Sequence, residues 1–457
     1  MGLRSIVRMR FTGGLAAALV GLAMAPAMPA QTAQPDAQTG LPILRSEHGP
    51  NSAQAMKAHY VVLVSLDGFR WDYAKRYGAA HLLALGKQGA WAPQGMLPSY
   101  PSLTFPNHYA IVTGLYPEHN GLVANGFLDE TREAEGKLAR YGIGNATAVT
   151  DGSFYSGVPL WSLAEKQGMR SACLFWPGSE AEIAGERPSE YMKFDDKVDE
   201  SARIDQIVSW LKEPETTRPH FITLYYSDVD HAGHAYGPDA PETKAAVGKV
   251  DALVGKLHAA LDTTGLPIDL VVVSDHGMVK IQGPWITLDQ FVDLKDFEAA
   301  GSLLYGKTEE DRAQAYNKLK KASEKFQAYR LKDVPAGLHY NENPREGDPV
   351  IVATGPYAIR AHGPGVDADG KPRPEREPEV GAHGFDPHTM PEMKASFFAE
   401  GPDIVAGKTL APFENVNIYP WIAHILGLNA PKSDGNLNIL AGTLRDNGDS
   451  SATAAKE

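Results

Sequence analysis

Cysteine is almost absent from this chain of 457 residues, in which Cys173 stands alone. A single cysteine excludes an intrachain disulfide, a cysteine-ligated zinc site and an iron–sulfur cluster. Basic residues are also outnumbered, with 43 Lys and Arg against 56 Asp and Glu and a formal net charge of −13. This balance argues against binding to nucleic-acid backbones or anionic membranes, which requires clustered positive charge. Any bound metal ion must therefore be held by His, Asp and Glu.

Two common catalytic motifs are missing as well. The sequence contains no Gly-x-Ser-x-Gly and no His-Glu-x-x-His, so the usual signatures of serine esterases and zinc peptidases are lacking. A P-loop pattern does occur at residues 301–308 (GSLLYGKT), but a polar segment precedes it where a P-loop needs a buried strand. We expect a short strand at 303–305 and a solvated, capped helix that starts at Thr308.

The two ends of the chain differ in composition from its middle. Residues 1–30 combine three arginines with an apolar run from Phe11 to Ala25 and small residues after it, which predicts a cleaved signal peptide. The run is shorter than the roughly 20 residues that span a bilayer, so we expect no stable membrane anchor after cleavage. We therefore expect a periplasmic or secreted protein. The remaining divisions that we predict are a flexible tether at 31–58, one large folded domain at 59–440 and a polar tail at 441–457.

Three short apolar runs each lead into an acidic residue. Residues 60–66 lead into Asp67, 221–226 lead to Asp230, and 270–274 lead into Asp275. Such continuous runs are typical of strands buried on both faces, so we predict an α/β fold with a mainly parallel central sheet and helices on both faces. Because sites in such folds lie beyond the carboxyl ends of the strands, the three aspartates are expected at one edge. An amphipathic helix is predicted from the spacing of Val247, Val250, Val254, Leu257 and Leu261.

Histidines accompany two of these aspartates. Asp230 and His234 are four residues apart, which places both on one face of a helical turn. Asp275 and His276 are adjacent at a strand end, and the following glycine would allow a sharp bend. Converging carboxylates repel one another unless cations lie between them, and Asp and His are ligands that suit zinc. The alternative is an ion-pair network without metal, but no Lys or Arg adjoins these aspartates in the sequence.

Thr104 precedes an apolar helical run that stops near Gly114. Pro106 suits the first turn of a helix and so places Thr104 at or just before its N-terminus. One interpretation is an ordinary N-cap threonine. The other is a nucleophile whose alkoxide is favoured by the positive helix end and by a metal ion.

Seven short motifs now distinguish these interpretations. In chain order they are residues 64–70 (VSLDGFR), 104–109 (TFPNHY), 113–117 (TGLYP), 175–179 (FWPGS), 230–234 (DHAGH), 274–278 (SDHGM) and 382–386 (AHGFD). Together they resemble the nucleotide pyrophosphatase/phosphodiesterase family of the alkaline phosphatase superfamily, in the family's own order. The resemblance implies an alkaline-phosphatase-like α/β fold and an exported hydrolase whose catalytic domain is the segment 59–440.

The resemblance also implies a site with two divalent metal ions, with zinc as the expected metal. One zinc would be held by Asp230, His234 and His383, and the other by Asp67, Thr104, Asp275 and His276. Thr104 matches the nucleophile, which would form a phosphothreonine intermediate and release a nucleoside monophosphate. Asn125 matches the residue that hydrogen-bonds a phosphoryl oxygen. His362 has a partly similar context and is rejected, whereas His388 remains a lesser rival to His383.

Three aromatic residues, Phe105, Trp176 and Tyr225, match positions that line the family's base-binding slot, although core packing is the alternative for Trp176. A small nucleotide is therefore the expected substrate, with no binding to a nucleic-acid backbone. The residue before the nucleophile is Leu103, where family members often carry lysine. The alternatives are a diesterase for choline or lysophospholipid headgroups, a phosphonoacetate-type hydrolase, and an inactive relative that only binds nucleotide.

Overall fold

The computed structural model describes residues 33–134, 136–365, 374 and 377–445. The predicted signal peptide and residues 446–457 of the predicted tail lie outside this described part. Within it, no helix combines the length and the apolar character needed to cross a bilayer.

The main sheet has ten strands within the described residues, in the order β1-β2-β8-β7-β9-β3-β10-β19-β4-β20. Its centre, from β8 to β10, is parallel, and β19 joins β10 in the antiparallel sense. β3 and β9 are buried along their whole length and are apolar except at Ser65 and Thr223, as expected for strands covered on both faces. The strands are β1 (Gln34–Pro35), β2 (Pro42–Arg45), β3 (Tyr60–Leu66), β4 (Ala90–Trp91), β7 (Ser171–Leu174), β8 (Glu190–Met192), β9 (Phe221–Tyr226), β10 (Ile268–Val273), β19 (Phe397–Glu400) and β20 (Lys408–Thr409).

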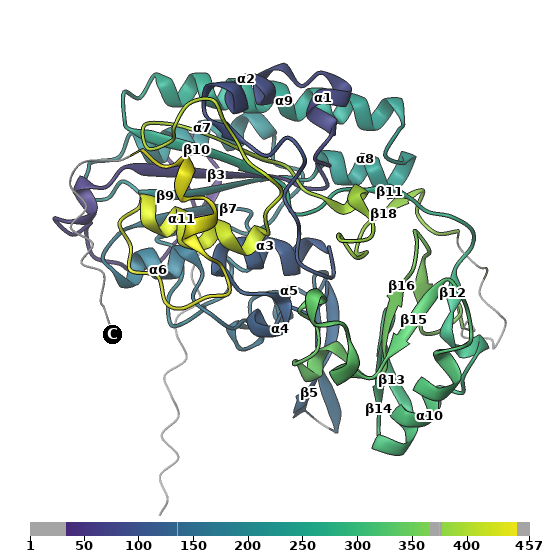
Figure 1. The fold of residues 1–457 in the computed structure, drawn as a ribbon. Helices are drawn as coiled ribbons and strands as arrows, with labels where there is room; N and C mark the ends of the chain where they lie inside the picture. The colour runs from purple at the N-terminus through teal and green to yellow at the C-terminus, as the bar shows by residue number, and fades with distance from the viewer. Residues whose placement is uncertain (1–32, 135, 366–373, 375–376, 446–457) are drawn as a thin grey trace, which may run out of the picture. The chain divides into compact units, whose positions relative to one another are not determined.

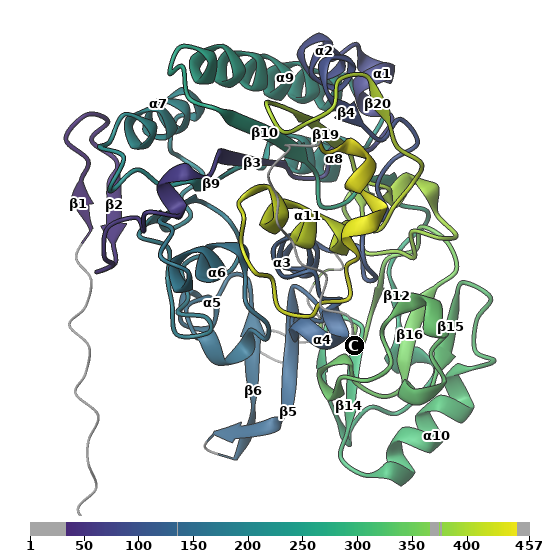
Figure 2. The same cartoon turned by 60° about the vertical axis from the view of Figure 1, so that its left-hand side comes forward.

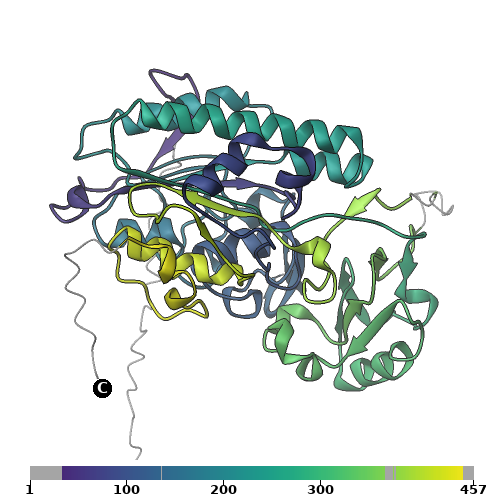
Figure 3. The same cartoon turned by 45° about the horizontal axis from the view of Figure 1, so that its top comes forward.

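Helices cover both faces of this sheet, as Figures 1 and 3 show. One face carries α1 (Tyr73–Tyr77), α2 (Ala80–Gln88), α7 (Glu200–Leu211) and α9 (Pro241–Asp262), and the other carries α3 (Thr104–Thr113), α6 (Leu160–Lys166) and α11 (Ile418–Ile425). The apolar stripe predicted for α9 is buried against the sheet at all five positions. The predicted α/β class, with a mainly parallel centre and two helical layers, is confirmed.

A second group of short elements, which we call the accessory module, lies between residues 286 and 361 (Figure 2). It packs around its own apolar core, which includes Leu304, Leu319 and Phe326. Its elements are β12 (Ile286–Thr287), β13 (Phe297–Ala300), β14 (Leu303–Gly306), α10 (Glu309–Leu319), β15 (Phe326–Tyr329), β16 (Val350–Ala353) and β17 (Ile359–Arg360). The P-loop pattern falls here on β14 and on a capping box between Thr308 and Asp311, as the sequence predicted.

The accessory module is fastened to a hairpin made of β5 (Gly126–Ala134) and β6 (Lys137–Gly142). Arg345 donates to the buried Asp129 carboxylate at 2.7 and 3.0 Å. The Tyr305 hydroxyl accepts from the Leu128 amide and donates to the Arg345 carbonyl. Because these bonds are shielded from water, they hold the module against the hairpin more firmly than surface contacts would.

The ends of the folded domain differ from the sequence prediction. Residues 31–58 were expected to be a tether, but in the described part of this segment β2 pairs with β8 in the main sheet and Ile43 is fully buried. Two-residue and four-residue strands are too short to display a period, which is why composition suggested a linker. At the other end, Thr443 is buried and Leu444 pairs with Ile404, so the packed domain runs to residue 445 rather than 440.

Candidate active site

The three predicted aspartates meet at the carboxyl edge of the central strands. Asp67 follows β3, Asp275 follows β10, and Asp230 lies on α8 (Asp228–Tyr236), which begins two residues after β9 ends. The registers align these strand ends, since Ser65 pairs with both Tyr225 and Val273. The sheet therefore delivers three carboxylates to one place.

Two overlapping groups of ligand atoms form there. Asp67, Asp275 and His276 make one group and Asp230, His276 and His383 the other, with the ligand atoms of each within 4.8 Å of one another. His276 Nε2 lies 3.0 Å from Asp275 Oδ2 and 3.5 Å from Asp67 Oδ1. His234 Nε2 lies 3.3 Å from Asp230 Oδ1 and 3.1 Å from His383 Nε2. All six residues predicted as Asp or His ligands are thus brought together.

Each of the three histidines is oriented by a backbone carbonyl. His234 Nδ1 donates to Gly381 at 2.9 Å, His276 Nδ1 to Gly277 at 2.9 Å and His383 Nδ1 to Ser102 at 2.9 Å. With Nδ1 occupied, Nε2 of each ring faces the cluster. This second layer of hydrogen bonds is the arrangement that fixes histidine ligands around a metal ion.

The carboxylates have oxygens that hydrogen bonds do not satisfy. Asp67 Oδ1, Asp230 Oδ1 and Asp275 Oδ2 are buried and accept no hydrogen bond from the described residues. A buried, unsatisfied carboxylate oxygen is costly, and three that converge on shared histidines fit a divalent cation. The residues present therefore suit the two-metal site that the family resemblance implied.

Burial and neighbouring charges shift several pKa values in the ligand cluster. Burial raises the pKa of the Asp67 carboxyl well above its usual value, and the neighbouring Asp275 and Asp230 raise it further. Burial and the nearby charge of His276 lower the pKa of His383 to about 3. Burial opposes protonation of His234, but Asp230 and Glu379 raise its pKa to about 10. A metal ion bound by these residues would compete with protons, because Asp and His bind metal in their deprotonated forms.

Thr104 is the first residue of α3, and Leu103 occupies the N-cap position. The Thr104 side chain therefore does not cap the helix. Its Oγ1 lies 3.3 Å from His276 Nε2, at the centre of the ligand cluster. Of the two interpretations left open by the sequence, the geometry fits the nucleophile and not the N-cap.

Two asparagines shape the surroundings of Thr104. Asn125 Oδ1 accepts from the Phe105 amide at 3.0 Å, which leaves the Nδ2 hydrogens of Asn125 free to donate. Asn107 was missed by the sequence analysis. Its Nδ2 lies 3.2, 3.0 and 2.9 Å from the carbonyl oxygens of Ser99, Pro101 and Leu103, so it holds the segment that leads into the nucleophile. The sequence signal that could have pointed to this role is the position of Asn107 three residues after Thr104.

A cavity of about 470 Å³ opens beside Thr104, and we call it the aromatic slot. The predicted residues Phe105, Trp176 and Tyr225 all line it. Trp176 is 1% exposed and donates its indole N–H to the His108 carbonyl at 3.1 Å, so it forms the rear wall and is at the same time a core residue. The Tyr225 hydroxyl donates to Asp67 Oδ2 at 2.5 Å, which links the slot to the ligand cluster.

Two further residues of the aromatic slot were not predicted. Glu180 lines it and accepts from the Phe194 amide at 3.0 Å, while Phe194 is 49% exposed at the edge of the slot. The rival histidines lie elsewhere. His388 is exposed, and His362 contacts Asp289 in the accessory module at 3.6 Å. Among the described residues, neither belongs to a group placed to hold a metal ion.

Comparison with known proteins identifies the family of this chain. Residues 61–386 match the family model described as type I phosphodiesterase / nucleotide pyrophosphatase, and the chain therefore belongs to this family. An uncharacterized pyrophosphatase/phosphodiesterase of Schizosaccharomyces pombe is 35% identical, over 82% of this chain and 78% of the relative. The human bis(5'-adenosyl)-triphosphatase ENPP4 is 32% identical, over 82% of this chain and 80% of its own.

A solved structure is similar over nearly the same span. An inactive variant of murine ectonucleotide pyrophosphatase / phosphodiesterase 5, in complex with AMP, superimposes with a TM-score of 0.76. It is 26% identical in sequence and covers 85% of this chain and all of its own. The predicted family, the alkaline-phosphatase-like fold and the assignment as a phosphodiesterase or pyrophosphatase enzyme are confirmed.

Proposed function

We propose that this protein hydrolyses phosphodiester or pyrophosphate bonds of nucleotides and releases a nucleoside monophosphate. The observation that carries the proposal is the position of the Thr104 hydroxyl among six Asp and His side chains, four of them buried, beside an aromatic slot. The AMP complex of the murine neighbour and the name of the human relative support a nucleotide as substrate.

Thr104 forms the new bond to phosphorus in the proposed reaction. The bond from phosphorus to the leaving group breaks, and an alcohol departs from a phosphodiester or a phosphate from a pyrophosphate. The nucleoside phosphate remains on Thr104 as a phosphothreonine ester until water cleaves it. Asn125 donates from Nδ2 to a phosphoryl oxygen, where charge grows in the transition state. Phe105, Trp176 and Tyr225 hold the base by its aromatic faces.

Two divalent metal ions complete the proposed site, and zinc is the expected metal. Asp230, His234 and His383 would hold one ion, and Asp67, Asp275 and His276, with Thr104, the other. When bound, such ions neutralise phosphoryl charge and favour the deprotonated nucleophile. The three unsatisfied carboxylate oxygens support this ligand set.

Substitution of Thr104 tests the proposal. Thr104→Ala is expected to lower kcat by a factor of about 10³ or more, because the covalent route is lost, while Thr104→Ser keeps measurable turnover. Metal content measured by elemental analysis stays close to that of the wild type. The matched control is Thr308→Ala, which also removes a threonine at a helix start but lies in the accessory module. Full activity of Thr104→Ala would assign the nucleophile elsewhere.

A choline phosphodiester is the second candidate substrate. A carboxylate among aromatic rings, as Glu180 is placed near Phe194, Tyr225 and Phe105, suits a quaternary ammonium group. Turnover of a choline ester without turnover of a dinucleotide would reverse the order of the candidates. An inactive nucleotide-binding relative is disfavoured by the complete ligand set, and zinc-dependent turnover would dismiss it.

We also propose export to the periplasm or the medium, with removal of residues 1–30. The arginines and the apolar run that follows them support this. Amino-terminal sequencing of the protein isolated from its native host tests it.

A further inference from the structure

A second cavity of about 540 Å³ adjoins the reaction centre, and we call it the leaving-group cavity. Leu103, Asn125 and His383 line it, yet none of its lining residues also lines the aromatic slot. The two cavities adjoin at the nucleophile, because Leu103 lines the leaving-group cavity and Thr104 lines the aromatic slot. A phosphorus atom at Thr104 therefore has a hollow on each side.

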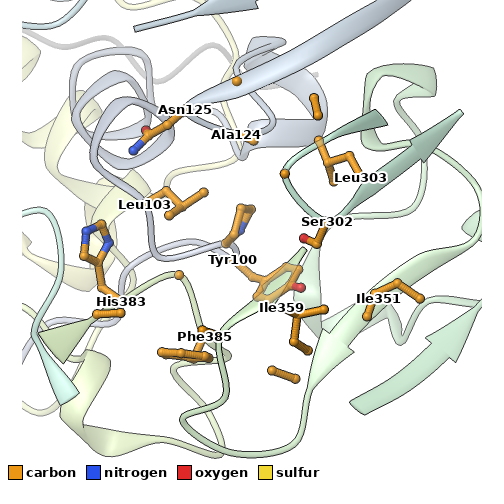
Figure 4. Close-up of a pocket in the computed structure, with 18 of the residues that line it drawn as sticks. Tyr100, Leu103, Ala124, Asn125, Ser302, Leu303, Ile351, Ile359, His383 and Phe385 are labelled. Atoms are coloured by element: carbon orange, nitrogen blue, oxygen red, sulfur yellow. The ribbon is translucent and has the colours of Figure 1, made fainter. Parts of the chain in front are cut away.

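The wall opposite the reaction centre comes from the accessory module. Figure 4 shows Asn125, Leu103 and His383 on one side of the cavity and Ser302, Leu303, Ile351 and Ile359 on the other. The module is held in place by the buried Arg345–Asp129 pair, and Arg140 of the hairpin donates to the Ala299 carbonyl at 3.1 Å. The cavity is therefore a preformed site, which lowers the entropic cost of binding.

The lining is apolar and almost without charge. Tyrosine, tryptophan, phenylalanine and aliphatic side chains dominate it, and among the described lining residues there is no Lys, Asp or Glu. Arg140 is the one permanent cation, and it lies exposed in β6. A diphosphate or longer polyanion would lose its hydration here and find too few partners, which is costly. An uncharged group would lose little and bury apolar area.

We propose that this cavity binds the alcohol that departs from the phosphodiester, and that this alcohol is uncharged and mainly apolar, with an alkyl chain or an aromatic ring. The inference rests on the proposed function, because it takes Thr104 as the nucleophile and the aromatic slot as the place of the retained nucleoside. The bond between phosphorus and the alcohol oxygen breaks with its electron pair on that oxygen, which gains a proton from water. Thr104 Oγ1 forms the new bond to phosphorus and loses its proton to water.

A series of adenosine 5'-phosphate esters tests the inference. The methyl, butyl and octyl esters have leaving groups of similar reactivity, so kcat/KM should rise about fourfold for each methylene that is buried and level off once the cavity is filled. A carboxylate at the end of the butyl chain should lower kcat/KM at least tenfold relative to the unmodified butyl ester. A benzyl ester, compared with the octyl ester, shows whether a ring or a chain fits better.

Variants locate the effect. Ser302→Phe should narrow the cavity and lower kcat/KM for the butyl and octyl esters much more than for the methyl ester. Ile359→Asp, which puts charge into the wall, should do the same, and the thermal melt of each variant establishes that it is folded. The matched control is Ile439→Asp, at an isoleucine that is 50% exposed and lines neither cavity.

The outcomes separate the two proposals. If neither a dinucleotide nor any ester is hydrolysed, the proposed function fails. If a dinucleotide is hydrolysed and no ester is, the proposed function stands and the apolar leaving group is refuted. If the methyl ester is hydrolysed but chain length and the terminal carboxylate make no difference, the proposed function stands and the apolar leaving group is refuted.

Discussion

Four consecutive residues at the start of α3 serve four different purposes. The Ser102 carbonyl orients His383, Leu103 lines the leaving-group cavity, and Thr104 presents its hydroxyl to the ligand cluster. Phe105 lines the aromatic slot and anchors Asn125 through its amide. A shift of one residue in this segment would therefore displace every part of the site at once, which explains why Asn107 binds the segment at three carbonyls.

The Tyr225 hydroxyl is predicted to support the metal site as well as the aromatic slot. Tyr225→Phe keeps the ring but removes the only hydrogen bond that Asp67 Oδ2 is seen to accept within the described residues. Loss of such a support typically weakens metal binding by about 10–100-fold. Competition with a chelator of known affinity measures this. The control is Tyr226→Phe, since the neighbouring hydroxyl has no hydrogen-bond partner among the described residues, and equal affinities of the two variants would refute the role.

Among individual residues, the sequence predicted the candidate metal ligands and the nucleophile but not the groups that orient them. Asp67, Asp230 and Asp275 were found because each follows an apolar run. The carbonyl partners of the histidines were missed, because Gly277 and Ser102 belong to loops and Gly381 to the two-residue strand β18 (Gly381–Ala382), and no local pattern encodes the course of either. The roles of Glu180 and Phe194 were missed for the same reason.

Among the secondary-structure elements, the long and periodic ones were predictable and the short ones were not. The buried runs became β3, β9 and β10, and the valine and leucine stripe became α9. The accessory module consists of strands of two to four residues around one helix, and it was not anticipated as a unit. Two of its strand pairs, β12 with β17 and β15 with β16, join segments that are far apart in the sequence, so only the folded structure reveals them.

The joint between the accessory module and the rest of the domain is predicted to respond to pH. Glu346 is fully buried, and burial, with Glu118 nearby, raises its pKa to about 9. An acid whose pKa is raised on folding contributes stability that is complete below its ordinary pKa of about 4.5 and is lost as the pH rises towards 9. Glu346→Gln removes this loss. The melting temperature of the variant minus that of the wild type should therefore increase by roughly 3–6 °C from pH 5 to pH 9.

Thermal unfolding at pH 5, 7 and 9 checks this prediction. The control is Glu298→Gln, at an exposed position in the same module. A melting-temperature difference between Glu346→Gln and the wild type that stays constant with pH would mean that Glu346 is not the group responsible.

The whole molecule places one reaction centre between two cavities of different character. The central sheet supplies the carboxylates and the aromatic slot, and the accessory module closes the leaving-group cavity. The motifs predicted this fold and family correctly, because seven short patterns in a fixed order are far more specific than any one of them. The position of the packed termini was not predictable, since edge strands as short as β1 and β2 leave no period in the sequence.

Removal of metal is predicted to affect activity and stability together. A strong chelator should abolish turnover and lower the melting temperature, because ions that bind only the folded state stabilise it. Zinc should restore both at about two equivalents per chain, the number that the two ligand groups imply. Turnover that persists after elemental analysis shows the protein to be free of metal would contradict the proposed mechanism.

The covalent intermediate offers the most direct test of the central claim that Thr104 attacks phosphorus. Turnover of a nucleotide ester is stopped with acid within milliseconds, and the digested protein is examined by mass spectrometry. A nucleoside monophosphate on Thr104 is expected in the wild type and should be absent from Thr104→Ala. A modified peptide that carries the group on another residue, or rapid turnover with no modified peptide at any time, would contradict it.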